Sequence, residues 1–139
     1  MATQRTIAVI GALEDAAKTV IKSLTKSGYR VLLFCKENDL SQLSSFATEK
    51  QFIGMDLEWM SCPIEASWEA DMVLLAVPAH EMADVAAMIR KVAIGKPVFD
   101  IGYDGAGSEE LQALLPHSVV GRASADTILS LVKPFFNKH

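Results

Sequence analysis

The residues that could do chemistry begin at the first turn of the chain. An apolar run, Ile7-Ala8-Val9-Ile10, passes into Gly11-Ala12-Leu13-Glu14-Asp15-Ala16. A strand that turns through a glycine into a helix can present backbone N–H groups to a phosphate, because the N-terminus of a helix favours negative charge. The turn therefore predicts a site for the diphosphate of a dinucleotide.

The glycine pattern of this turn is incomplete. Gly11 supplies the tight turn, and Ala16 is small enough for close packing of the helix. Leu13 stands where a G-x-G-x-x-G turn has its second glycine, or Glu14 does if the alignment is shifted by one residue. The carboxylates of Glu14 and Asp15 suit the helix dipole but repel a diphosphate. Two interpretations stay open: a weakened binding turn, or one that no longer binds.

The end of the next strand suggests which dinucleotide would fit. Cys35 and Lys36 occupy this end, where an Asp or Glu usually meets the ribose hydroxyls of NAD. The ammonium of Lys36 could meet a 2′-phosphate instead, which favours NADP. A lysine just past a strand is also commonly plain solvated surface, and Glu37 beside it weakens the NADP interpretation.

His80 follows Val77-Pro78-Ala79 at the end of the longest apolar strand. A neutral imidazole there can contact a cofactor or relay a proton. No Ser, Cys or second His is placed by sequence to complete a nucleophilic set, so a capping or exposed histidine is the alternative. Metal-ligand spacings, the P-loop and the G-x-S-x-G turn are absent from the sequence, which excludes metallohydrolases, P-loop NTPases and serine hydrolases.

A glycine-rich loop, Gly102 to Gly107, follows another apolar strand. Such a loop can close over a ligand, and Ser108 after it is suited to cap the helix that starts at Glu109.

Strands and helices alternate along the rest of the chain. We expect strands at 7–10, 29–34, 51–53, 72–77, 97–101 and 118–121. We expect helices at 13–26, 39–50, 82–89, 109–115 and 125–132, and leave 54–67 unassigned. This order predicts an α/β fold of Rossmann-like, doubly wound type, with a mostly parallel six-stranded sheet and helices on both faces in three layers.

Bulk properties limit the partners. With 139 residues, half of them apolar, the chain is expected to form one domain, 1–139, with its own core. A net charge of −4 without a basic cluster argues against nucleic acid and anionic membranes. Cys35 and Cys62 lack ligand spacing and are expected to be reduced thiols. No apolar run approaches the roughly 20 residues that span a bilayer, so we expect a cytoplasmic protein.

Several of these segments together resemble a known family. Three of them lie near the start of the chain: Thr6 to Gly11, the helix up to Gly28, and Tyr29-Arg30-Val31. A fourth is the strand Glu69-Ala70-Asp71-Met72-Val73-Leu74-Leu75-Ala76-Val77-Pro78. With Leu111 to Arg122, they resemble the N-terminal domain of coenzyme F420-dependent NADP oxidoreductases and their pyrroline-5-carboxylate reductase relatives.

The resemblance implies a role for each matching residue. Gly11, Ala12 and Leu13 would line the diphosphate turn. Cys35 and Lys36 would meet the adenosine ribose phosphate of NADP. Val77, Pro78 and His80 would flank the nicotinamide.

The sequence also departs from the family. The diphosphate turn has lost glycines, and the helical domain that completes the substrate site in these enzymes has no counterpart in the 139 residues. Catalysis would then need a partner or a homodimer to supply the other wall of the site. The alternative is a degenerate Rossmann or coenzyme A-binding-like domain that serves as an interaction or regulatory module.

Overall fold

The computed structural model describes residues 5–11, 15–34, 56–60, 62–77, 79–101 and 108–122, together with Ile128, Ser130 and Val132. Its sheet has the order β3-β2-β1-β4-β5-β6, and all five neighbouring pairs are parallel. The strands are β1 (Thr6–Ile10), β2 (Arg30–Phe34), β3 (Leu57–Trp59), β4 (Met72–Leu75), β5 (Pro97–Asp100) and β6 (Val119–Arg122). The predicted six-stranded, doubly wound sheet is confirmed.

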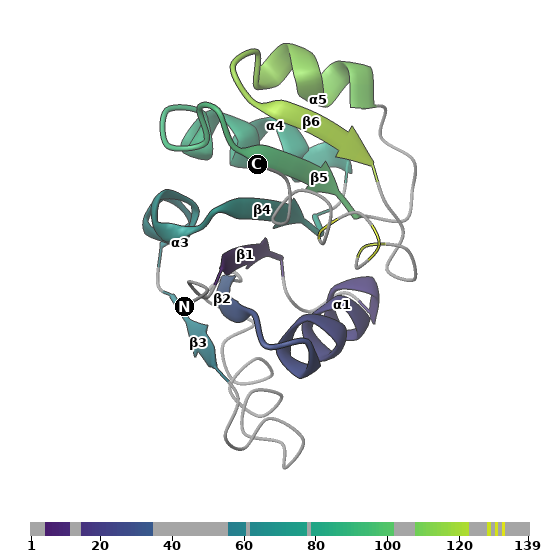
Figure 1. The fold of residues 1–139 in the computed structure, drawn as a ribbon. Coiled ribbons are helices and arrows are strands. Elements are labelled where there is room, and N and C mark those ends of the chain that lie inside the picture. The colour runs from purple at the N-terminus through teal and green to yellow at the C-terminus, as the bar shows by residue number, and fades with distance from the viewer. Residues whose placement is uncertain are drawn as a thin grey trace.

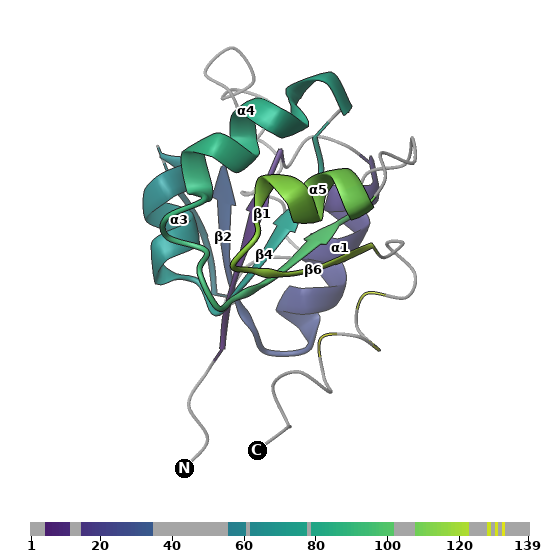
Figure 2. The same ribbon diagram turned by 90° about the horizontal axis from the view of Figure 1, so that it is seen from above.

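Helices cover both faces of the sheet (Figure 1). They are α1 (Asp15–Lys26), α3 (Pro63–Glu69), α4 (Ala79–Ile89) and α5 (Ser108–Leu114). The helix α1 lies on one face, and α3, α4 and α5 lie on the other (Figure 2). Ile128 and Val132 are helical and buried in the same core as α1, as expected for a closing helix at 125–132. None of the described helices has the length and apolar composition to cross a membrane.

Each face of the sheet has its own apolar core. Along β1, Ile7 and Val9 belong to the core on the α1 side, whereas Ala8 and Ile10 belong to the core under α3, α4 and α5. All residues of β1 and β4 are buried, because these two strands lie at the centre of the sheet with helices on both sides. This burial explains why their sequences are apolar at every position rather than at alternate ones.

The helix α1 ends where the sequence predicts. Gly28 has a φ of +89°, a left-handed conformation that glycine adopts at little cost. The amide of Gly28 donates to the carbonyl of Thr25, and the amide of Tyr29 donates to that of Leu24. These two bonds form a Schellman motif, which satisfies carbonyls of the last helical turn and leads the chain into β2.

The segment between β2 and β4 contains two elements that the sequence did not predict. The predicted third strand, 51–53, lies outside the described residues, and the strand that pairs with β2 is Leu57–Trp59. The predicted helix 39–50 also lies outside them. The unassigned stretch contains α3, a helix that begins with Pro63, whose ring fits the first helical turn. Cys62 precedes this helix as a free, partly exposed thiol, and Cys35 is outside the described residues.

A lysine fixes the end of α3 to the sheet. The ammonium of Lys96, just before β5, donates to the carbonyl oxygens of Ser67 and Trp68 at 2.8 and 2.7 Å. Both carbonyls belong to the last turn of α3, where a cation is favoured by the helix dipole. The bonds therefore connect the first half of the fold to the second.

The contact between β5 and β6 leads to a first prediction. Gly121 is in register with Phe99, and a Cβ added to Gly121 would lie 2.8 Å from Cε1 of that ring. We expect Gly121→Ala to lower the free energy of unfolding by about 1–2 kcal/mol, because the buried ring must shift. Urea denaturation measures this loss. Val119→Ala, at an exposed position of the same strand, is the control and should change stability little. Equal stability of the two variants would contradict the steric argument.

Candidate functional site

The candidate site lies at the carboxyl-terminal edge of the sheet. The last residues of four adjacent strands, Phe34, Ile10, Leu75 and Asp100, are in register across β2, β1, β4 and β5. The strand order reverses between β1 and β4, since the chain builds outward to β3 before it returns to β4. Ligands of doubly wound folds bind at such a reversal, beyond the carboxyl ends of the strands.

Backbone hydrogen bonds hold this edge together just past the last strand residues. The amide of Gly11 donates to the carbonyl of Phe34 at 2.8 Å, and the amide of Ala76 donates to that of Ile10 at the same distance. The amide of Ile101 donates to the carbonyl of Leu75 at 2.9 Å. These hydrogen bonds therefore join the ends of β2, β1, β4 and β5 to one another.

The atoms around Gly11 leave no room for a side chain at this position. Its φ is +86°, and a Cβ at this position would lie 2.4 Å from the carbonyl oxygen of Ala76 and 2.9 Å from Cγ1 of Val77. Only glycine fits such a turn without moving the neighbouring backbone. The tight turn predicted for Gly11 is confirmed, and the turn lies against Ala76 and Val77, just after β4.

The structure thus brings two of the predicted site residues together. Gly11 and Val77 are neighbours at the point where the strand order reverses. His80 belongs to the first turn of α4, at the same edge. The other predicted site residues lie outside the described residues: Ala12, Leu13, Cys35, Lys36 and Pro78.

Two long helices direct their N-termini toward this edge. The helix α1 follows β1 and α4 follows β4, and a helix that joins parallel strands runs opposite to them. Its N-terminus, with unpaired amides and a partial positive charge, therefore lies at the carboxyl edge. Asp15 is the first residue of α1, and Glu81 lies in the first turn of α4. The carboxylate of Glu81 reduces the positive potential that a phosphate would meet at the N-terminus of α4.

Asp100 is a residue of this edge that the sequence analysis missed. It ends β5 and is only 2% exposed, on the same side of the sheet as Val98. Arg122, its register partner on β6, is exposed. The signal that could have revealed it is a carboxylate directly after the apolar pair Val98-Phe99. A charged side chain at a buried strand position is rare and commonly has a specific role. Within the described part of the chain, no three acidic, histidine or cysteine side chains lie close enough to hold a metal ion.

Solved structures similar to this chain share its fold. A pyrroline-5-carboxylate reductase from Coxiella burnetii superposes with a TM-score of 0.70 and 20% identity, over 86% of this chain and 43% of that one. A putative F420-dependent NADP reductase from Arthrobacter superposes with a TM-score of 0.68 and 18% identity, over 92% of this chain and 66% of that one. An imine reductase from Myxococcus stipitatus in complex with NADP+ superposes with a TM-score of 0.64 and 16% identity, over 88% of this chain and 43% of that one.

The chain spans less than half of the two longer of these proteins. No curated protein matches it in sequence. The sequence profile of one family does match, that of the coenzyme F420-dependent NADP oxidoreductases, over residues 6–103. This match begins with β1, runs past the end of β5 and includes both strands at the reversal. The chain therefore belongs to the coenzyme F420-dependent NADP oxidoreductase family.

Proposed function

We propose that this chain binds NADP(H) at the carboxyl edge of its sheet and acts as the nucleotide half of an oxidoreductase. The observation that supports this most directly is the enclosure of Gly11 between β1 and β4, at the reversal of strand order. A Cβ there would meet the carbonyl oxygen of Ala76, so Gly11 keeps the tight turn that the first glycine of a dinucleotide-binding fingerprint provides. The imine reductase complex with NADP+ is a solved example of the same fold with this cofactor.

Three groups of residues would each contact a different part of the cofactor. Gly11, Ala12 and Leu13 would meet the diphosphate at the N-terminus of α1. Cys35 and Lys36 would meet the 2′-phosphate after β2. Val77, Pro78 and His80 would border the nicotinamide after β4. The bound cofactor would supply the chemistry, a hydride at the nicotinamide ring, and these residues would orient the ring.

The other wall of the active site would come from a second molecule. The chain covers 43% of the pyrroline-5-carboxylate reductase whose fold it shares. The domain alone leaves one side of the nicotinamide open, and in this proposal a second copy of the chain or another protein in the cytoplasm covers it.

Ligand titration followed by thermal unfolding tests the proposal. At ten times its dissociation constant, NADP+ should stabilise the fold by about 1.4 kcal/mol, because it binds only the folded state. Lys36→Ala should weaken NADP+ more than NAD+, whereas the control Lys91→Ala, at an exposed position after α4, should weaken neither. An equal loss for both cofactors would remove Lys36 from the site. Absence of any shift with millimolar NADP+ or NAD+ would refute cofactor binding.

A second candidate function rests on the acids of the first turn. Asp15 begins α1, and Glu14 precedes it in the sequence. Two carboxylates at this helix N-terminus would oppose a diphosphate, and the domain would then serve as an interaction or regulatory module, or bind a coenzyme A fragment. The double substitution Leu13→Gly with Glu14→Gly separates the two. Tighter NADP+ binding by this variant indicates a weakened cofactor site; binding of coenzyme A alone favours the second function.

A further inference from the structure

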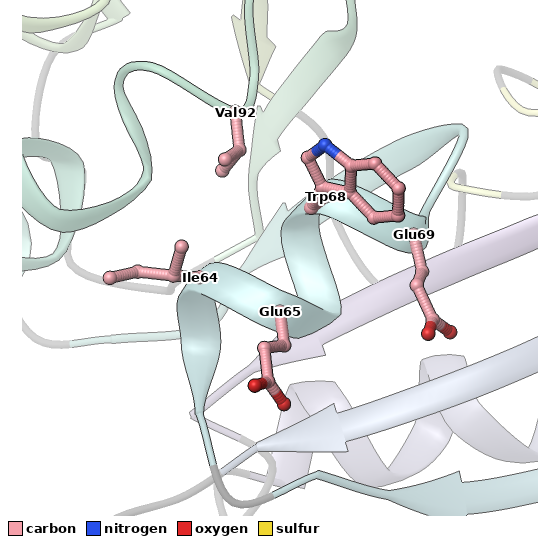
Figure 3. Close-up of a pocket in the computed structure, with 5 residues that line it drawn as sticks. All are labelled: Ile64, Glu65, Trp68, Glu69 and Val92. Carbon is pink, nitrogen blue, oxygen red and sulfur yellow. The ribbon is translucent and has the colours of Figure 1, made fainter.

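The outer surface of α3 is divided into an apolar flank and an acidic flank. Ile64 and Trp68, one helical turn apart, are 40% and 68% exposed on one flank. Glu65 and Glu69 have the same spacing on the other flank (Figure 3). Large apolar side chains exposed together on a helix commonly mark a surface that another molecule covers.

A hollow of about 330 Å³ lies beside this helix. It is lined by Ile64, Glu65, Trp68, Glu69 and Val92. In Figure 3 the side chains of Ile64, Trp68 and Val92 surround one space, while the two carboxylates point away from it across the helix. Tryptophan is the residue most enriched among those that dominate binding energies, so Trp68 is suited to anchor a contact.

The acidic flank has more negative than positive charge. Nη2 of Arg30 lies 2.9 Å from Oε2 of Glu58 and 3.5 Å from Oε2 of Glu69. Glu65 forms no ion pair with any described residue. Among the described residues, two carboxylates thus share one guanidinium and Glu65 has no cation, so the three carboxylates exceed this guanidinium by two negative charges. A molecule that covers this surface is favoured if it supplies cations there.

The separation of the two flanks indicates the size of that molecule. An α-helix with its side chains is about 10 Å across, so a small cation reaches one flank only. An extended polypeptide rises about 3.3 Å per residue, and about three residues cross the helix. An apolar side chain can then occupy the hollow while a nearby Lys or Arg reaches Glu65.

We infer that α3 and the segment around Val92 form a docking surface for a segment of another protein. This segment presents an apolar side chain to the hollow at Trp68 and a Lys or Arg, about three residues away, to Glu65 and Glu69. The surface lies toward the amino-terminal edge of the sheet, since Lys96 and Arg30, which begin or precede strands, contact the last turn of α3. It is therefore remote from Gly11, and a partner can dock while the opposite edge holds a cofactor.

Selection from a displayed library of random dodecapeptides on the full chain tests this inference. We expect enriched peptides to share an apolar residue close to a Lys or Arg. Trp68→Ala should weaken such a peptide about tenfold, since truncating an anchoring tryptophan typically costs more than 1 kcal/mol. Glu65→Lys should weaken it about fivefold, as for the loss of an exposed ion pair, and more at low salt.

Matched controls distinguish the surface from general effects. Val119→Ala removes an exposed apolar side chain from β6, and Asp84→Lys reverses an exposed charge on α4; both should keep the wild-type affinity. Circular dichroism checks that each variant is folded. Three results would each overturn the inference: no enrichment, enriched peptides without a cation, or equal binding to Trp68→Ala. Self-association that Trp68→Glu abolishes would also overturn it, because a second copy would then cover the surface. NADP+ titration of the same variants is independent of all these outcomes.

Discussion

Gly11→Ala is expected to lower the free energy of unfolding by about 4 kcal/mol, the largest loss among the single substitutions considered. Two effects add. A non-glycine residue at a φ of +86° is strained by about 1–3 kcal/mol. The new Cβ would also lie 2.4 Å from the carbonyl oxygen of Ala76, which is backbone, so β4 must move relative to β1 at a further cost of about 1–3 kcal/mol. Urea denaturation measures the sum.

Gly28→Ala is the matched control for Gly11→Ala. Gly28 has nearly the same φ, +89°, but an added Cβ would meet no atom within 4 Å. It should therefore cost only the backbone strain, about 1 kcal/mol. Equal losses for the two variants would show that the contact with Ala76 contributes nothing, and the enclosure of the first turn would lose its physical basis.

Lys96→Met is expected to lower the free energy of unfolding by about 3 kcal/mol, because it removes two hydrogen bonds from a charged donor. The carbonyls of Ser67 and Trp68 would lose their shared ammonium partner at the end of α3. Lys91→Met, at an exposed position, is the control for lost charge and should leave stability nearly unchanged. A loss in Lys91→Met as large as that in Lys96→Met would contradict the proposed role of the bonds.

The difference in stability between the wild type and Lys96→Met should depend on pH. Partial burial lowers the pKa of Lys96 from its ordinary value, and the nearby carboxylate of Asp71 opposes this shift. Between the lowered pKa and the ordinary lysine value, the unfolded chain binds more protons at this site than the folded one. Stability therefore rises with pH across this alkaline range. The difference between wild type and Lys96→Met should grow from neutral to alkaline pH; a difference that shrinks would contradict the direction of the shift.

The centre of the sheet was predictable from sequence because its strands are apolar at every position. Ile7 to Ile10 and Met72 to Leu75 are both buried strands in the structure, and Gly28 ends α1 as expected. The predicted extension of the fourth strand to Val77 is longer than β4, although the amide of Ala76 still bonds to Ile10. These segments were readable because burial on both faces leaves a strong local pattern.

The elements around β3 were not predictable for an equally physical reason. Leu57–Trp59 has three residues and is an edge strand, so it shows no period that distinguishes it from a loop. The helix α3 has seven residues, and its buried face contains Pro63 and Ser67, which weaken an apolar helical pattern. Pairing with β2 and packing on the sheet, which are tertiary contacts, define both elements.

The candidate site was predictable only in part. Gly11 stood out, because a glycine between a strand and a helix has few other roles. Asp100 did not, because one Asp after an apolar run resembles a turn residue until register places it beside Leu75. The exposure of Trp68 was not predictable either, since it depends on which face α3 turns toward the sheet.

The strand order has a consequence for how the protein is made. The first strand of the chain sits in the middle of the sheet, and one of its two neighbours, β4, begins at Met72. On the ribosome, one edge of β1 therefore stays unpaired until β4, which begins at Met72, has been synthesised. Long-range parallel pairing of this kind folds slowly and exposes apolar surface meanwhile. A molecular chaperone that recognises extended apolar segments would bind the nascent chain during this interval.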